Sequence, residues 1–274
     1  MEERNVLCID DGKSNRLYLR DLWEYRELFG VLAWRDIIVR YKQTVVGVAW
    51  SVLRPLITML VFTVVFGKIA QLPSDKGVPY TLMVFAGMLP WQYFSNTVLT
   101  GSEALIGNQG LISKVYFPRL IIPTTRILVS LAELLVSAVI FVPLFFIYGY
   151  LPSWQIVFVP FFILLATLFS LGCTYILSSL NVKFRDFRYV VPFMVQFGLY
   201  LSPVGFSSAA IPAKWQTLYA LNPMVGIIDG VRWSLFDAPL SATAFWSAVI
   251  WSVAILLAGF WCFRRMENEF ADYI

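Results

Sequence analysis

The longest uncharged stretch of the chain, residues 134–182, restricts its fold more than any other feature. It contains no Asp, Glu, Lys or Arg. A helix needs roughly 20 apolar residues to cross a hydrocarbon core of about 30 Å, so this stretch is too long for one crossing and suits two. Residues 149–153, Gly-Tyr-Leu-Pro-Ser, are typical of a turn. We therefore predict two membrane-spanning helices, 121–148 and 155–180, joined by a hairpin.

Four further segments with few charges predict the remaining crossings. They are residues 45–69, 78–102, 189–206 and 242–263. The 274-residue chain is 59% apolar and only 14% charged, and a soluble domain of this size cannot bury so much apolar surface in one core. The fold class that we predict is an all-α membrane protein, in which six transmembrane helices form one domain over residues 45–274.

Lys and Arg are distributed unevenly between the two sides that six crossings define. If both termini are cytoplasmic, 17 of the 21 Lys and Arg residues lie at the cytoplasmic side. Cytoplasmic loops carry an excess of Lys and Arg, so this orientation is the expected one. The basic residues form no cluster of the kind that binds nucleic acid, and their distribution favours membrane lipid as the partner.

The polar front of the chain, residues 1–44, forms a cytoplasmic N-terminal segment in this scheme. Within residues 19–42, Leu22, Tyr25, Phe29 and Leu32 recur at three- and four-residue spacing, with charged residues elsewhere around the helix. This pattern predicts an amphipathic helix lying in the cytoplasmic headgroup layer. A small soluble cap is the alternative.

The segment between the fifth and sixth spans predicts a different structure. Residues 215–228 are apolar but too few to cross a bilayer, and Pro203, Pro212 and Pro223 divide the region into short elements. Such a pattern favours short re-entrant helices. An ordinary extracytoplasmic loop is the alternative.

The sequence offers no site for catalysis. It contains no His, and Cys8, Cys173 and Cys262 are far apart, so we expect no metal site and no cofactor bound by this chain. Residues 11–14 contain Gly-Lys-Ser, but position 7 is Leu where a phosphate-binding loop needs Gly. The chain is therefore predicted to be a permease subunit and not an enzyme. A membrane transferase is a poorer alternative, because that class normally uses acidic or His side chains.

Energy for transport would then come from a partner ATPase or from an ion gradient. Ion-coupled carriers place several acids at mid-membrane, whereas few ionisable residues are embedded here, so we expect the partner ATPase. Glu133 lies inside the third span, and Arg126 lies two turns earlier on roughly the same face. We expect Glu133 to face the bundle interior, either paired or beside a wet path. A structural acid near the interface is the alternative.

Two groups of aromatic residues are candidates for a channel lining. Aromatic faces stack on the apolar faces of sugar rings, and Tyr hydroxyls bond their hydroxyl groups. Aromatic belts and lipid-facing stripes are the alternative. The candidates are Trp91, Tyr93, Phe94, Tyr189, Phe193, Phe197 and Tyr200.

Several short strings, in order along nearly the whole chain, carry a resemblance to a known family. They are RDI (35–37), RYKQT (40–44), GVAW (47–50), LRPL (53–56), GMLPW (87–91), FSN (94–96), NVKFRD (181–186), SPV (202–204) and NPM (222–224). On the six-helix plan, the chain resembles the permease subunits of ABC-2 type polysaccharide exporters, which export O antigens, capsules and teichoic acids.

The resemblance implies a homodimer in the bacterial cytoplasmic (inner) membrane, with the pore between its two copies. Two separate ATP-binding subunits would hold ATP and Mg beneath it. The cargo would be a glycan on an undecaprenyl-diphosphate lipid, and we expect O antigen of lipopolysaccharide. An ABC-2 permease for a small lipid, drug or natural product is the alternative.

The resemblance and the basic charges also suggest two sets of site residues. The front helix and the loop after the second span would couple to the ATPase, and basic side chains at headgroup level would receive the lipid diphosphate. The coupling candidates are Arg35, Asp36, Arg40, Tyr41, Ile106, Gln109 and Lys114. The entry candidates are Lys114, Arg119 and Arg126, for which simple anchoring at the cytoplasmic surface is the alternative.

Overall fold

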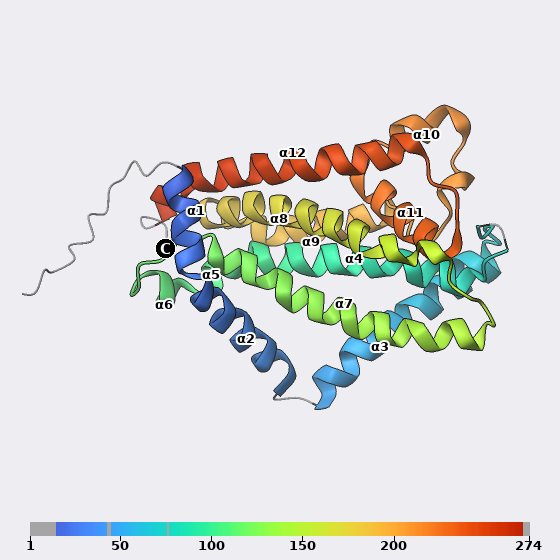
Figure 1. Cartoon of the computed structure of the whole chain (residues 1–274), viewed down its shortest axis with the longest axis horizontal. Coiled ribbons are helices and arrows are strands. Elements are labelled where there is room, and N and C mark those ends of the chain that lie inside the picture. The colour runs from blue at the N-terminus through green and yellow to red at the C-terminus, as the bar shows by residue number, and fades with distance from the viewer. Residues whose placement is uncertain (1–14, 43–44, 76, 271–274) are drawn as a thin grey trace, which may run out of the picture.

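Uncharged apolar segments form the long helices of this protein, because a helix pairs its own backbone groups where water is absent. The computed structural model describes residues 15–42, 45–75 and 77–270, and this part of the chain contains helices and no strands. The long helices lie mostly along one axis, with α3 at an angle to it, and those that follow one another in the chain run in opposite directions (Figure 1). They are α3 (Val45–Phe62) with the π-helical η1 (Thr63–Ile69), α4 (Tyr80–Ser102), α7 (Ile121–Ile147), α8 (Val159–Lys183), α9 (Phe187–Tyr200) and α12 (Ala242–Met266).

Shorter helices lie at the two ends of this bundle (Figure 1). At one end, here called the α1 end, lie α1 (Asn15–Glu24), α5 (Ala104–Gly107), α6 (Gln109–Ile112) and η4 (Glu267–Glu269). From the α1 end, α2 (Arg26–Lys42) runs outward at an angle to the bundle. The opposite end, here called the α10 end, carries η2 (Trp154–Phe158), η3 (Ser208–Ala210), α10 (Ala213–Tyr219) and α11 (Pro223–Phe236).

Three described segments are long and apolar enough to cross a membrane. They are Ile121–Ile147, Trp154–Lys183 and Ala242–Glu269. The first two confirm the pair of helices predicted from the uncharged stretch, and Gly149 provides the turn between them with φ 61°. The predicted spans 45–69 and 78–102 correspond to α3 with η1 and to α4. Their crossing of a bilayer stays a prediction.

The fifth span, predicted over residues 189–206, extends beyond the C-terminal end of the helix that the structure shows. α9 stops at Tyr200 and has 14 residues, about 21 Å of helix, which is short of a hydrocarbon core of about 30 Å. Pro203 lacks a backbone N–H and disfavours helical geometry in the residue before it. The chain turns here instead, with Val204 N donating to the Ser202 carbonyl at 2.7 Å.

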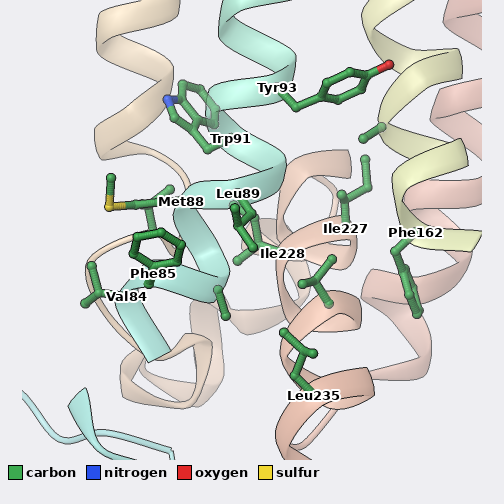
Figure 2. Close-up of a cluster of buried hydrophobic side chains, with 14 of the residues drawn as sticks. Val84, Phe85, Met88, Leu89, Trp91, Tyr93, Phe162, Ile227, Ile228 and Leu235 are labelled. Carbon is green, nitrogen blue, oxygen red and sulfur yellow. The ribbon is translucent and has the colours of Figure 1, made fainter. Parts of the chain in front are cut away.

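The core of the bundle is built around α4, which is buried on almost all sides. Figure 2 shows Phe85 of α4 near Ile227 and Ile228 of α11, with Phe162 of α8 on their far side. Phe85 also stacks on Phe141 of α7, with ring centroids 4.9 Å apart. Because α4 contacts α3, α7, α8, α9 and α11, it is the central helix of the bundle, and α12 packs outside it on α8 and α11.

Small residues bring α8 and α12 into close contact. A Cβ atom on Gly172 would lie 2.4 Å from the Ile255 backbone, and one on Gly259 would lie 2.4 Å from the Gly172 carbonyl oxygen. Close backbone approach at small residues is the usual packing mode of helices in lipid, where no hydrophobic effect drives helices together.

The N-terminal segment confirms the predicted apolar face but not a single helix. Leu22, Tyr25, Phe29 and Leu32 pack toward the bundle at the α1 end, whereas Trp23 is exposed. The helix bends at Tyr25 and divides into α1 and α2. The Arg26 guanidinium donates to the Trp23 carbonyl at 3.4 Å, close to this bend. Residues 1–14, including Cys8 and the Gly-Lys-Ser string, lie outside the described residues.

The segment between α9 and α12 confirms the predicted division into short elements. The apolar stretch 215–228 is split between α10 and α11, because Pro223 starts a new helix and Asn222 caps it by accepting from Met224 N at 3.0 Å. Twelve of the 14 residues of α11 are buried, including the guanidinium of Arg232. An ordinary exposed loop does not describe this region.

Candidate functional site

Two buried carboxylates join the outlying helix α2 to the bundle. Asp36 lies on α2 and Glu133 lies on α7, and their side chains are 9% and 11% exposed. Each accepts an ion pair from an arginine on the other helix. A buried carboxylate is costly without such partners, so these contacts hold the two helices together.

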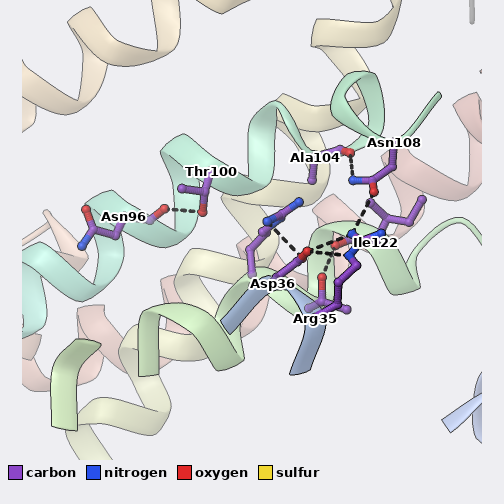
Figure 3. A network of polar contacts seen from close by, with 9 residues as sticks. Arg35, Asp36, Asn96, Thr100, Ala104, Asn108 and Ile122 are labelled. Carbon is purple, nitrogen blue, oxygen red and sulfur yellow. Dashed lines mark hydrogen bonds and ion pairs between the residues drawn. The ribbon is translucent and has the colours of Figure 1, made fainter. Parts of the chain in front are cut away.

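Asp36 is the centre of the first group (Figure 3). Its two carboxylate oxygens accept from Arg126 of α7 at 3.0 Å and from Arg35 of α2 at 2.8 Å. The same Arg35 guanidinium donates to Asn108 Oδ1 at 3.0 Å, and the Asn108 amide donates to the Ala104 carbonyl at 2.8 Å. Asp36 therefore links α2 to α7 and, through Arg35, to the α5–α6 turn.

Glu133 is the centre of the second group. Its carboxylate pairs with Arg40 of α2 and accepts from the Asn96 amide of α4 at 2.7 Å. Thr100 donates to the Asn96 carbonyl at 2.7 Å (Figure 3). The cavity beside Glu133 is only about 10 Å³, room for one water at most. Glu133 therefore faces the interior as a paired acid and not along a wide wet path.

The two groups form a reciprocal connection. On α2 the acid, Asp36, precedes the base, Arg40, by one turn, while on α7 the base, Arg126, precedes the acid, Glu133, by two turns. Each acid meets the base of the other helix. A displacement of α2 is thus transmitted to α7 and, through Asn96, to α4. Sequence reasoning placed Arg126 and Glu133 on one face of their helix but missed their partners on α2.

The other coupling candidates lie at the α1 end. Gln109 and Lys114 are exposed, and Ile106 is half-buried. The side chain of Tyr41 lies outside the described part of the structure. Arg35 and Arg40 are 46% and 39% exposed, so each reaches solvent while it is paired. Asp36 is buried by its two arginines and fastens α2 rather than offering a free surface.

The three entry candidates do not form one cluster. Lys114 and Arg119 line a cavity of about 220 Å³ formed by the loop before α7. Arg119 also donates through Nη1 to the Glu267 carbonyl at 2.6 Å, which ties this loop to the end of α12. Arg126 does not line that cavity and is engaged with Asp36.

A further junction at the α1 end joins α1 to the end of α12. The Glu267 carboxylate accepts from Tyr18 at 3.0 Å and from Arg264 at 2.9 Å, and the Arg264 guanidinium lies 3.7 Å from the Tyr18 ring centroid. Burial, and then the Glu267 charge, raise the pKa of Tyr18 above its ordinary value. The hydroxyl therefore stays protonated as the donor.

The two aromatic groups occupy different environments. Trp91 and Tyr93 are buried within the bundle, and Tyr93 shares a 2.8 Å hydrogen bond with Thr167 of α8. Phe94 stacks on Phe169 of α8. The members on α9, by contrast, form one exposed stripe. They are Tyr189, Phe193, Phe197 and Tyr200.

The aromatic stripe on α9 is suited to contact with apolar surface. Its four rings are between 55% and 77% exposed, and Phe193 stacks on Phe197 with centroids 6.2 Å apart and planes 13° from parallel. Lipid, a second copy of the chain or sugar rings could cover such a surface. The buried rings of α4 are part of the core of this chain, so the candidate lining divides into these two parts.

No metal site is present in the part of the chain that the structure describes. Within it, no three Cys, Asp or Glu side chains come close enough to hold an ion. Cys173 and Cys262 are free thiols there. The polar groups of the α1 end are ion pairs and hydrogen bonds that connect helices.

Comparison with known proteins identifies the family. A model of the ABC-2 type transporter family matches residues 27–236. The O-antigen export system permease protein RfbA of Myxococcus xanthus is 30% identical over 260 residues, covering 93% of this chain and 98% of the relative. RfbA of Klebsiella pneumoniae is 26% identical over 251 residues, covering 90% and 95%.

A third relative is named for the export of a different polysaccharide. The capsule polysaccharide export inner-membrane protein CtrC of Neisseria meningitidis is 24% identical over 246 residues, covering 88% of this chain and 92% of the relative. The family match includes α2, the two ion-paired groups and the short helices α10 and α11. This protein is therefore a multi-pass membrane protein that belongs to the ABC-2 type transporter family.

Proposed function

We propose that this chain is the channel-forming subunit of an ATP-driven exporter that moves lipid-linked polysaccharide, with O antigen as the cargo class. One observation carries the proposal: the chain is similar, over nearly its whole length, to permeases named for O-antigen export. The similarity to a capsule export protein supports a polysaccharide cargo in general. The site suits a subunit that moves, because its charged groups connect α2 to α7 and α4.

The membrane arrangement that we propose has six crossings and two cytoplasmic termini. The crossings are α3 with η1, α4, α7, α8, α9 continued by residues 201–206, and α12, with α10 and α11 as re-entrant elements at the extracytoplasmic end. Residues 45–274 then form one transmembrane domain. The distribution of Lys and Arg supports this orientation. Large apolar side chains exposed along α7 and α12, such as Phe146 and Trp261, support contact of these helices with lipid.

The cargo path would run between two copies of the chain. The exposed stripe on α9 provides rings on which sugars can slide without a deep binding site. Lys114 and Arg119 line a cavity at headgroup level, where each basic group favours an anionic lipid by about 1 kcal/mol. They are the residues that we propose receive the undecaprenyl diphosphate, with Arg126 holding α2 behind them.

ATP and Mg would be held by two copies of a partner subunit below the α1 end. The partner would press on α2 and on the α5–α6 turn, and the ion pairs of Asp36 and Glu133 would carry that movement to α7 and α4. Two exposed residues, Gln109 and Lys114, lie in or beside the turn that must face the partner.

Cysteines placed at these two positions test the coupling surface. Gln109→Cys and Lys114→Cys, in a chain without its native cysteines, should each crosslink to the ATP-binding subunit. Leu218→Cys is the matched control, because Leu218 is 60% exposed but lies on α10 at the other end. Crosslinks from Leu218 but not from Gln109 or Lys114 would show that the α10 end, and not the α1 end, faces the ATP-binding subunit.

Deletion of the gene tests the function itself. Surface polysaccharide should disappear and lipid-linked polymer should accumulate inside the cell, because synthesis continues while export stops. Complementation with this chain should restore the surface polymer only when the partner ATPase is active. An unchanged cell surface, together with increased sensitivity to a drug or loss of a small lipid, would favour the alternative of a small-molecule permease.

A further inference from the structure

A cavity at the α10 end, lined by apolar and polar side chains, is not used by the proposed transport path. It has a volume of about 340 Å³ and lies between η3, α10, α11 and the first turn of α12. This volume is at the lower end of the range of about 300–1,000 Å³ for small-molecule sites, and it suits one sugar unit. Its polar lining includes Ser208, Gln216, Tyr219, Asp229 and Thr243.

Asp229 is the charged group of this cavity, and it keeps free acceptor capacity. The residue is only 6% exposed, yet its nearest cation, Arg232 Nη1, is 3.9 Å away. Arg232 directs its donors elsewhere, to the carbonyls of Met83, Val204 and Phe206 at 3.0–3.2 Å. The Ser208 hydroxyl lies beside the carboxylate without a well-formed hydrogen bond.

Tyr219 supplies a second group without a partner. Its hydroxyl is buried and has no hydrogen-bond partner among the described residues. Gln216 donates its amide to the Ile211 carbonyl at 3.0 Å, which leaves the amide oxygen as an acceptor. Buried polar groups normally find partners, so an unpaired hydroxyl near a carboxylate that has only a distant cation indicates a ligand that bonds both.

The charges around the cavity decide what kind of ligand fits. A cation bound at Asp229 would be repelled by the buried Arg232, and an anion would be repelled by Asp229 itself. A neutral ligand with several hydroxyl groups avoids both penalties: it donates to the carboxylate and accepts from the Tyr219 hydroxyl. From this geometry we infer that the cavity binds one sugar unit of a neutral glycan segment.

This inference rests on the proposed function, because the sugar would belong to the exported polymer. In the proposed orientation the cavity lies at the extracytoplasmic end, where the polymer leaves the channel. A weak site here would hold successive sugar units and oppose backward sliding, since conduction needs sites that bind weakly and release.

The test uses the complete transporter, with its ATP-binding subunits, in detergent. The probe is the oligosaccharide released by mild acid from the surface polysaccharide of the same cells, titrated by saturation-transfer NMR. Tyr219→Phe should weaken binding about five-fold, the loss expected for one hydrogen bond. Asp229→Asn should weaken it at least as much. Tyr150→Phe, the same change at the same end but outside the cavity, should bind as the native chain does.

Stability separates a ligand-binding role from a structural one. The Tyr219 hydroxyl has no partner to lose, so Tyr219→Phe should melt at the native temperature or slightly above it. Equal affinity in the native chain, Tyr219→Phe and Asp229→Asn would overturn the inference, and so would a requirement for Ca²⁺ or Mg²⁺. If the native chain exports polymer but binds no oligosaccharide, this inference alone fails. If gene deletion leaves surface polymer intact, the proposed function fails.

Discussion

Arg232→Met is expected to remove a large part of the folding stability of this protein. The Arg232 side chain is fully buried and donates to the carbonyls of Met83, Val204 and Phe206, so it joins α11 to α4 and to the chain that follows α9. Methionine has a similar volume but no donors. Three buried carbonyls would lose their donor, and Asp229 would lose its nearest cation.

The expected size follows from the cost of a buried group left unpaired. Removing one partner of a buried ionic network costs about 3–5 kcal/mol, against a total stability of about 5–15 kcal/mol for a typical protein. Size-exclusion profiles and melting curves of the detergent-purified chain measure the effect. The variant should aggregate or melt far below the native chain.

Two further substitutions make this prediction specific. Arg232→Lys keeps the charge but lacks the planar fork that serves several acceptors, so its loss should be intermediate. Arg185→Met removes an exposed arginine in the α8–α9 turn and should change stability by less than about 0.5 kcal/mol. If Arg232→Met melted like Arg185→Met, the carbonyl contacts would not be holding α11 in place.

Reversing the charge of Arg40 is expected to reduce export at least ten-fold, a drop of about 1.4 kcal/mol or more in coupling between helices. Arg40→Glu would place a second carboxylate beside Glu133, whose side chain is only 11% exposed, so the two negative charges would repel each other. Breaking a buried pair costs several kcal/mol, but Arg40 is 39% exposed, so a loss of about 1–3 kcal/mol in stability is expected. Export of surface polymer and the melting temperature measure the two effects.

The double reversal distinguishes this pair from a general charge effect. The double variant Arg40→Glu/Glu133→Arg restores an ion pair with the acid on α2 and the base on α7. It should recover part of the export and stability. The surface pair Arg20–Glu24 is a matched control, with side chains 75% and 57% exposed, and its reversal should have little effect. Independent, additive losses in the Arg40 and Glu133 variants would show that the two side chains do not act as a pair.

The sequence predicts the fold well in segments without charges. It predicts less well the positions at which helices end or bend, because tertiary contacts determine them. The uncharged stretch 134–182 predicted α7, α8 and the turn between them, because lipid excludes charges and requires helices. Pro203 indicates that α9 ends early, but the apolar residues around it continue to residue 206 and suggest a longer helix. The bend at Tyr25 has no Gly or Pro to mark it.

The candidate site was less predictable, because its contacts join residues far apart in the chain. Asp36 meets Arg126, and Arg40 meets Glu133, across about ninety positions that no local pattern connects. Arg232 lies in the segment that the sequence places between the fifth and sixth spans, and only tertiary packing surrounds it with carbonyls. Tyr93 and Tyr189 are equivalent candidates in the sequence. The packing of α4 against α8 buries Tyr93, whereas Tyr189 stays exposed on α9.

Movement of polymer across a reconstituted membrane tests the central claim most directly. The purified chain and its ATP-binding partner, placed together in vesicles, should carry lipid-linked polysaccharide to the opposite side when ATP is added. Neither subunit should do so alone, and this chain should hydrolyse no ATP by itself. Transport that continues without ATP and follows an ion gradient, or ATP hydrolysis by this chain alone, would contradict the account.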